Sequence, residues 1–429
     1  SSVGTSVGGP CAESATRVMF RAPFSRLSLR GHAWRQRPLG VRHAQAVVAA
    51  AGAGSAALCF GWGGPRHATG CSVSSLLPTL PVCTDSKFAK IHAAEAKVLA
   101  LMPDTPYETR DVPVRLDAKA RCFLRRPAME YTIRTVIIGE EHADRAPIVL
   151  VHGFMMGSAG FFKLLPLLAR HRRVYAIDII GMGGSGRPPF DAERATAAEA
   201  EELLVKPFEL WAEAMGLSKF VLLGHSYGGF VATCWADRQA DAVLCLGLLS
   251  PLLGFSDERI SRLMEPKEGE SWRRYAFRSL VETAWERHIT PQTLVRWCPG
   301  FKSWFERMSV HRFGRDGWVA DMTDEEGRLL SAYLAATLDA PASAEATATV
   351  CFGPMLRAMP VGGLTVKQRL ARLAAPVFAV YGDHDWMDRP DPAELPACDF
   401  VTIERSGHHL YFDNPQALAS CILQRIRDF

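Results

Sequence analysis

Short apolar runs alternate with helical stretches between about residue 129 and residue 253. Met129–Ile138 alternates apolar and polar side chains, which is typical of a half-buried strand. Pro147–Val151 is continuously apolar, as strands buried in a parallel sheet are. Similar runs predict strands at Val174–Asp178, Phe220–Leu223 and Val243–Leu249, and helical patterns cover Phe161–Leu168, 200–216 and Phe230–Arg238. Strands that alternate with helices indicate an α/β fold with a mostly parallel, doubly wound sheet.

This alternation is interrupted over residues 254–368, where the pattern is helical and rich in tryptophan. Five of the ten tryptophans lie in this stretch, namely Trp272, Trp285, Trp297, Trp304 and Trp318. Strand patterns return at Pro376–Tyr381 and Phe400–Ile403, and Asn414-Pro415 is a favourable start for a final helix. We therefore predict an α/β core over residues 91–253 and 369–429, with a helical cap inserted over residues 254–368.

The first part of the chain differs from the rest in charge. The net charge is +4, but residues 1–80 contain eight arginines, no lysine and a single acid, Glu13, so they carry about +7. An arginine- and serine-rich segment that is poor in acids is typical of an organelle transit peptide. We therefore predict a targeting or disordered leader over residues 1–90, for a plastid or a mitochondrion, with a cytoplasmic or membrane-associated location as the alternative. Because the first residue is not Met, we expect a fragment or a processed form.

Composition argues against several other classes of protein. The chain beyond the leader is nearly neutral, which argues against nucleic-acid binding. The Ala- and Gly-rich run Gln45–Phe60 is too short and too weakly apolar to predict a membrane span, and an anchor or bipartite signal is the alternative. The eleven cysteines are scattered without a C-x-x-C pair or a Cys/His cluster. The sequence therefore predicts no zinc site, no disulfide framework and no other metal or cofactor, and a reducing compartment fits it best.

A serine between two glycines marks the end of one predicted strand. Gly224-His225-Ser226-Tyr227-Gly228 fits the pattern G-x-S-x-G, with an apolar strand before it and an amphipathic helix after it. In that context the motif forms a nucleophile elbow, a sharp turn that tolerates only small flanking residues. We predict that Ser226 is a catalytic nucleophile, and the alternative is an ordinary serine in a Gly-rich turn.

A serine hydroxyl needs a general base and an acid that orients this base. After a strand-turn-helix nucleophile these partners follow in the order acid, then histidine, at the ends of later strands. Asp383 and Asp385 follow the strand at 376–381, and His408 and His409 follow the strand at 400–403. We predict Asp385 as the acid and His408 as the base, with Asp383 and His409 as the alternatives.

Backbone N–H groups must meet the negative charge that develops on the attacked carbonyl oxygen. One donor should be Tyr227, the residue after the nucleophile, and we assign the other to Phe154 in the turn after Pro147–Val151. The glycine-rich stretch Asp178–Gly186 also follows a strand. It lacks the spacing of a nucleotide-binding loop, so we interpret it as a structural loop beneath the nucleophile turn.

The order of these motifs resembles that of the α/β-hydrolases over about residues 125–429. The motifs are Val151-His-Gly-Phe154, Asp178-x-x-Gly-x-Gly-x-Ser185, Gly224-His-Ser-Tyr-Gly-Gly229, Gly382-Asp-His-Asp-Trp-Met387 and Gly407-His-His409. In addition, His408-His-Leu-Tyr-Phe-Asp413 fits H-x4-D, and the insertion contains Ile289–Arg296 and Ala340–Glu345. With these features the chain resembles a lipid-acting subfamily that includes lysophospholipases, plant acyltransferases and a lipase co-activator.

The resemblance implies a serine acyl hydrolase that cleaves carboxylic esters of phospholipids or lysophospholipids through an acyl-enzyme. It also implies an acyltransferase motif, His408 with Asp413, that could act on lysophosphatidic acid. The co-activator has Asn at the position of Ser226, so the serine argues for hydrolysis. The alternatives are hydrolysis of another small or prenyl ester, and a non-catalytic scaffold that recruits a lipase. The aromatic and cationic cap could associate peripherally with a membrane, or its tryptophans could pack against the core. The oligomeric state is not predicted.

Overall fold

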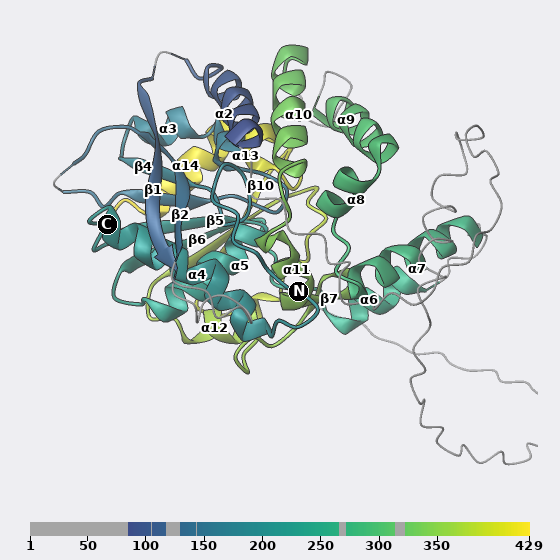
Figure 1. Cartoon of the computed structure of the whole chain (residues 1–429). Coiled ribbons are helices and arrows are strands. Elements are labelled where there is room, and N and C mark those ends of the chain that lie inside the picture. The colour runs from purple at the N-terminus through teal and green to yellow at the C-terminus, as the bar shows by residue number, and fades with distance from the viewer. Residues whose placement is uncertain (1–84, 104, 117–128, 143, 266–271, 314–321) are drawn as a thin grey trace, which may run out of the picture. The chain divides into compact units, whose positions relative to one another are not determined.

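The computed structural model describes residues 85–103, 105–116, 129–142, 144–265, 272–313 and 322–429 (Figure 1). Most of the leader predicted over residues 1–90, and with it the predicted targeting signal, lies outside the described residues. The helix α2 (Asp85–Leu99) begins before residue 90, so its first residues overlap the end of the predicted leader. Among the described helices, none combines the length and the apolarity needed to cross a bilayer.

Eight strands form the central sheet in the order β1-β2-β4-β3-β5-β6-β9-β10. They are β1 (Tyr107–Leu116), β2 (Met129–Ile138), β3 (Ile148–Val151), β4 (Val174–Ile177), β5 (Phe220–His225), β6 (Val243–Leu249), β9 (Val377–Gly382) and β10 (Cys398–Ile403). The strand β2 pairs antiparallel with β1 and β4, and all the other pairs are parallel. This arrangement confirms the predicted α/β class with a mostly parallel sheet.

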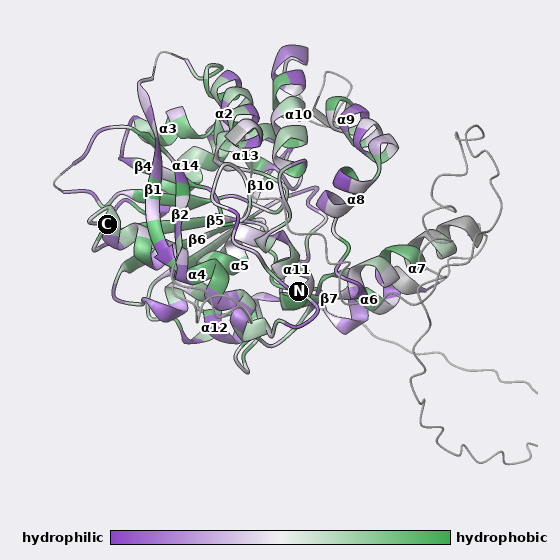
Figure 2. Ribbon diagram, viewed as in Figure 1, coloured by the Kyte–Doolittle hydropathy of each residue, from purple (hydrophilic) through white to green (hydrophobic). Residues whose placement is uncertain are grey.

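The two faces of this sheet build two separate hydrophobic clusters, because successive side chains of a strand point in opposite directions. In β3, Val149 and Val151 join one cluster, which includes α4 (Ala197–Ala214) and α5 (Tyr227–Arg238). Ile148 and Leu150 join the other, which includes α3 (Leu165–Ala169) and α14 (Pro415–Arg425). The central strands are therefore buried on both faces, and hydrophobic residues concentrate in them (Figure 2).

Proline and asparagine residues decide where two of the predicted helices begin. Instead of one helix over Phe161–Leu168, the chain forms a 3-10 turn at Ser158–Phe161 and the short helix α3. Pro166 lies in the first turn of α3, where its missing N–H leaves no helical hydrogen bond unmade. As predicted, α14 begins at Pro415, and the side chain of Asn414 accepts a hydrogen bond from the N–H of Ala417.

A helical insertion joins β6 to β9. Its helices are α6 (Asp257–Met264), α7 (Trp272–Glu286), α8 (Pro291–Trp297), α9 (Pro299–Phe313), α10 (Asp324–Leu338), α11 (Thr347–Cys351) and α12 (Val366–Arg372), with a two-residue hairpin of β7 (Phe352–Gly353) and β8 (Arg357–Ala358). All of them fall within or next to the segment predicted as the cap. The last, α12, crosses the boundary drawn at residue 368, because it packs on α5 of the core.

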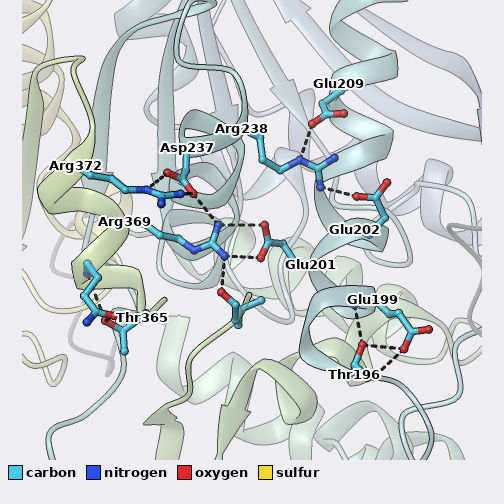
Figure 3. Close-up of polar contacts among 12 residues, drawn as sticks. Thr196, Glu199, Glu201, Glu202, Glu209, Asp237, Arg238, Thr365, Arg369 and Arg372 are labelled. Carbon is cyan, nitrogen blue, oxygen red and sulfur yellow. Dashed lines mark hydrogen bonds and ion pairs between the residues drawn. The ribbon is translucent and has the colours of Figure 1, made fainter. Parts of the chain in front are cut away.

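A buried ion-pair network fastens α12 to α4 and α5 (Figure 3). The guanidinium of Arg369 donates hydrogen bonds to both oxygens of Glu201, at 3.1 and 2.8 Å, and to Asp237 at 2.9 Å. It also donates to the carbonyl of Val361 at 2.6 Å. Arg372, which is half-exposed, binds the same Asp237 from the rim of the network.

Replacing Arg369 with methionine is expected to lower the free energy of unfolding by about 3–5 kcal/mol, because two buried carboxylates would lose their counter-charge. Urea unfolding followed by circular dichroism measures the change. The matched control is Arg372→Met, which removes an exposed partner of Asp237 and should cost far less. Equal losses in the two variants would contradict a stabilising role for the buried pairing.

Candidate active site

Ser226 occupies the turn between β5 and α5, in a conformation that few non-glycine residues adopt. Its φ is +52° and its ψ is −117°, and its N–H donates to the carbonyl of Leu249 at 3.0 Å. A Cβ on Gly224 would lie 2.4 Å from the carbonyl oxygen of Gly228, and a Cβ on Gly228 would lie 2.4 Å from that of His152. Both flanking glycines are therefore required by close backbone packing, which holds the serine in its strained turn.

The structure brings Ser226 together with one histidine and one carboxylate from distant parts of the chain. Nε2 of His408 lies 3.1 Å from Oγ of Ser226, and Nδ1 of the same ring lies 3.1 Å from Oδ1 of Asp385. Burial by itself would raise the pKa of Asp385, but the hydrogen bond and the charge of His408 outweigh it, and the pKa is lowered. Asp385 is thus a carboxylate at neutral pH, placed to hold the His408 ring and to stabilise its protonated form.

The two alternatives for acid and base take different places. Asp383 accepts hydrogen bonds from the backbone N–H groups of Arg405 and Ser406, each at 2.9 Å, and these bonds lower its pKa. Asp383 therefore ties the loop after β9 to the loop after β10. His409 packs its ring against Phe412, at 5.7 Å between centroids, in the short helix α13 (Leu410–Asp413). The geometry favours Asp385 and His408.

His225, which the sequence marked only as part of the nucleophile motif, connects the nucleophile turn to the loop of the base. Its Nε2 lies 2.9 Å from the backbone carbonyl of His408, and the two rings are 4.8 Å apart. Burial lowers the pKa of His225 to about 3. The ring is therefore neutral at physiological pH, and its Nε2–H donates to this carbonyl and so fixes the position of His408.

The two residues predicted to stabilise the oxyanion flank Ser226. Tyr227 is the first residue of α5, and Phe154 follows Gly153, whose added Cβ would lie 3.1 Å from Cβ of Ser226. The rings of Phe154 and Tyr227 meet edge to face, with centroids 5.8 Å apart. The hydroxyl of Tyr227 is 2.8 Å from that of Thr347 in the cap segment. The turn that contains Phe154 and the start of α5 therefore both lie against Ser226.

The remaining predicted residues hold loops. Asp413 of the H-x4-D motif accepts a hydrogen bond from the N–H of Gly407 at 2.8 Å, so its carboxylate shapes the turn just before His408. Asp178 accepts hydrogen bonds from the N–H groups of Ser158 at 2.5 Å and Gly184 at 2.6 Å. These contacts fit the structural interpretation of the Asp178–Gly186 loop. In the described ranges, no group of His, Cys, Asp and Glu is arranged to hold a metal ion.

Sequence reasoning missed an aromatic side chain that lies beside the base. The ring of Trp386 is 4.9 Å from that of His408 and 6.1 Å from that of Phe255, and it is 49% exposed. Arg259 of α6 holds this segment, because it donates to the carbonyl of Trp386 at 2.5 Å and pairs with Asp388 at 2.6 Å. The sequence contained a clue to this position, because Trp386 directly follows Asp385, the predicted acid.

Comparisons with known proteins agree with the fold. A family described as "alpha/beta hydrolase fold" matches residues 146–415. A probable 1-acylglycerol-3-phosphate O-acyltransferase of Oryza sativa subsp. japonica is 32% identical over 373 residues, and the match covers 83% of this chain and 84% of that protein. The (lyso)-N-acylphosphatidylethanolamine lipase of Homo sapiens is 28% identical, with 69% of this chain and 83% of that protein covered. Among solved structures, a carboxylesterase of Bacillus subtilis superimposes with a TM-score of 0.51 at 18% identity, over 79% of this chain and 98% of that chain.

Proposed function

The chain belongs to the α/β-hydrolase fold family, and on that premise we propose that it is a serine hydrolase of carboxylic esters in phospholipids or lysophospholipids. One observation carries the proposal. The hydroxyl of Ser226, in its strained turn, lies 3.1 Å from a buried imidazole whose other nitrogen lies 3.1 Å from a carboxylate. This is the arrangement that makes a serine nucleophilic.

In the proposed reaction, Nε2 of His408 takes the proton of Ser226 as Oγ attacks the acyl carbonyl carbon. The N–H groups of Tyr227 and Phe154 stabilise the oxyanion, and Asp385 stabilises the imidazolium. The tetrahedral intermediate then expels the alcohol, which receives its proton from His408 and leaves the acyl group on Ser226. Water, deprotonated by the same imidazole, attacks the acyl-enzyme, releases the carboxylic acid and restores the hydroxyl.

The lipid substrate is supported by the relatives, which are named for acting on lysophosphatidate and on N-acylphosphatidylethanolamine. The relatives named as acyltransferases favour a second reaction as well. In that reaction the hydroxyl of a lysolipid replaces water in the last step and receives the acyl group from Ser226. Both reactions use the same acyl-enzyme, so the concentrations of water and acceptor at the site decide between them.

A screen of lipid classes tests the proposed function. The full-length protein is offered phospholipids, lysophospholipids and neutral acylglycerols, with and without a lysolipid acceptor, and the free fatty acid and acylated acceptor are quantified by mass spectrometry. We expect fatty-acid release from the phosphorylated lipids and none in Ser226→Ala. If the folded wild-type protein released no fatty acid and reacted with no fluorophosphonate, the function would instead be non-catalytic.

We also propose that the cap binds the membrane surface from which the substrate comes. Trp297 at the end of α8 is 67% exposed, and Trp304 of α9 is 47% exposed. Met308, one turn after Trp304, is exposed as well. Exposed tryptophans are suited to insertion at the level of lipid head groups. By contrast, Trp285 is partly buried and donates to a cap carbonyl, so the cap tryptophans divide between packing and exposure.

The double variant Trp297→Ser/Trp304→Ser is expected to bind anionic phospholipid vesicles about tenfold more weakly, because it loses two apolar side chains that would leave water on binding. Vesicle co-sedimentation measures the change. Tyr107→Ser, which removes an exposed aromatic side chain from β1, is the matched control. If both variants bind vesicles as the wild type does, the cap is not the membrane-binding surface.

A further inference from the structure

A charged pocket lies where the first helix of the cap, α6, meets the loop after β9. The helix α12 and the 3-10 turn Pro392–Glu394 complete its wall. Its charged lining residues are Arg259, Arg262, Lys367, Asp388, Arg389 and Glu394. The cavity has a volume of about 200 Å³, whereas a single water needs only about 10–15 Å³. The pocket can therefore hold a ligand considerably larger than one water.

The lining side chains carry a surplus of positive charge. Four of them are cations and two are carboxylates, which leaves a formal surplus of two positive charges. Arg259 pairs with Asp388 at 2.6 Å. Lys367 pairs with Glu394, also at 2.6 Å. Both carboxylates of the lining are thus already paired, and no carboxylate of the described residues pairs with Arg389. Such a surplus attracts anions.

The fourth cation, Arg262, has only an exposed partner. It pairs with Glu258, one turn earlier in α6, at 2.7 Å, and both side chains are at least 70% exposed. An exposed pair of this kind contributes little free energy, so the guanidinium can turn to another anion at small cost. Arg262 and Arg389 therefore offer two guanidinium groups that a bound anion can contact without breaking a buried ion pair.

Two of the other contacts show that the wall of the pocket is held in place. Arg259 donates to the carbonyl of Trp386 at 2.5 Å, and its guanidinium lies 4.7 Å from the ring centre of Phe255. Arg389 donates to the hydroxyl of Thr402 at 2.8 Å. Guanidinium groups that are already oriented lose little conformational entropy on binding, and their planar donors match the oxygens of a phosphate. The pocket is therefore better suited to a phosphate group than to a compact ion such as chloride.

The pocket is separate from the candidate active site. Neither Ser226 nor His408 lines it, and Asp385 does not line it either. The link between the two is the loop after β9, in which Asp388 lines the pocket and Met387 donates its N–H to Asp385 at 3.1 Å. A ligand in the pocket therefore lies outside the set of groups that would carry the chemistry.

We propose that this pocket binds a phosphate dianion or a phosphomonoester, as a ligand additional to the substrate. The phosphate oxygens accept hydrogen bonds from Arg262 and Arg389, and the two negative charges match the formal surplus of the lining. The inference goes beyond the proposed function, because it concerns a second ligand and stands even if the protein hydrolyses no ester.

The first test measures the binding of inorganic phosphate by isothermal titration calorimetry, at an ionic strength held constant with chloride. We expect one saturable site in the wild type. The double variant Arg262→Met/Arg389→Met should raise the Kd by about 10- to 100-fold, because two charged hydrogen bonds are lost. The matched control, Arg194→Met/Arg427→Met, removes two exposed arginines outside the pocket and should leave the Kd unchanged. No saturable binding by the wild type, or an unchanged Kd in the first double variant, overturns the proposal.

The second test asks whether the phosphate belongs to a soluble molecule or to a lipid head group. Vesicles of phosphatidylcholine, with and without phosphatidic acid, are co-sedimented with the wild type and with Arg262→Met/Arg389→Met. If the variant loses the additional binding to phosphatidic acid, a head group reaches the pocket. If it loses only inorganic phosphate, the ligand is soluble, and both results support the site. Ser226→Ala should bind inorganic phosphate with the wild-type Kd. Weaker binding by Ser226→Ala would place the phosphate at the candidate active site and overturn the proposal.

Discussion

Replacing Ser226 with alanine is expected to lower kcat for ester hydrolysis by about 10⁶-fold, with little change in the free energy of unfolding. The attacking atom would be lost, whereas the turn around it is held by backbone contacts that alanine keeps, such as the hydrogen bond of its N–H to Leu249. Hydrolysis of a p-nitrophenyl ester measures the rate, and covalent labelling by a fluorophosphonate measures the nucleophile directly. Both signals should disappear together.

Ser218→Ala is the matched control for this variant. Ser218 is an exposed serine just before the amino end of β5, whereas Ser226 follows the carboxyl end of the same strand. It should leave rate and labelling unchanged. If Ser226→Ala still hydrolysed the ester at the wild-type rate, the serine would be a structural element of a Gly-rich turn and another group would carry the chemistry.

The second large effect is expected for the base. His408→Ala should lower kcat by a factor similar to that of Ser226→Ala, because the two side chains act as one unit and neither works alone. Fluorophosphonate labelling should slow as well, since the hydroxyl would no longer have a group to take its proton. The value of KM should change far less than kcat.

His409→Ala is the natural comparison, because it changes the adjacent residue of the same type. The ring of His409 packs against Phe412 of α13. We therefore expect His409→Ala to lower the stability of the protein and to reduce its activity modestly. A larger loss of kcat in His409→Ala than in His408→Ala would show that the base was assigned to the wrong histidine.

The core of the fold could be predicted because its strands are locally distinctive. The continuous apolar runs of β3, β5 and β6 bury both faces, so their pattern is visible within a few residues. Two elements escaped prediction for the opposite reason. The edge strand β1 exposes charged side chains such as Glu108 and Arg110, and its alternation is weak. The helix α2 begins within the end of the predicted leader and has little net apolar character.

The candidate site was predictable as far as its residues follow motifs in a fixed order. Ser226, Asp385 and His408 come at the ends of recognisable strands, and the structure places them within hydrogen-bonding distance. Contacts between distant segments could not be read in the same way. Arg369 and Glu201 are 168 residues apart, and neither neighbourhood shows which partner it will meet. The contact between the hydroxyls of Tyr227 and Thr347 depends likewise on how the cap folds over the core.

The insertion between β6 and β9 has a consequence for how this protein can change. The pairing of Leu246–Leu249 with Val377–Val380 uses no cap residue, so the sheet closes whatever the length of the segment between these strands. Doubling the length of a connecting segment adds only about 0.6 kcal/mol of closure entropy. Mutation and recombination can therefore reshape the cap while Ser226, Asp385 and His408 stay in place. The cap and the candidate catalytic residues can thus evolve independently within one chain.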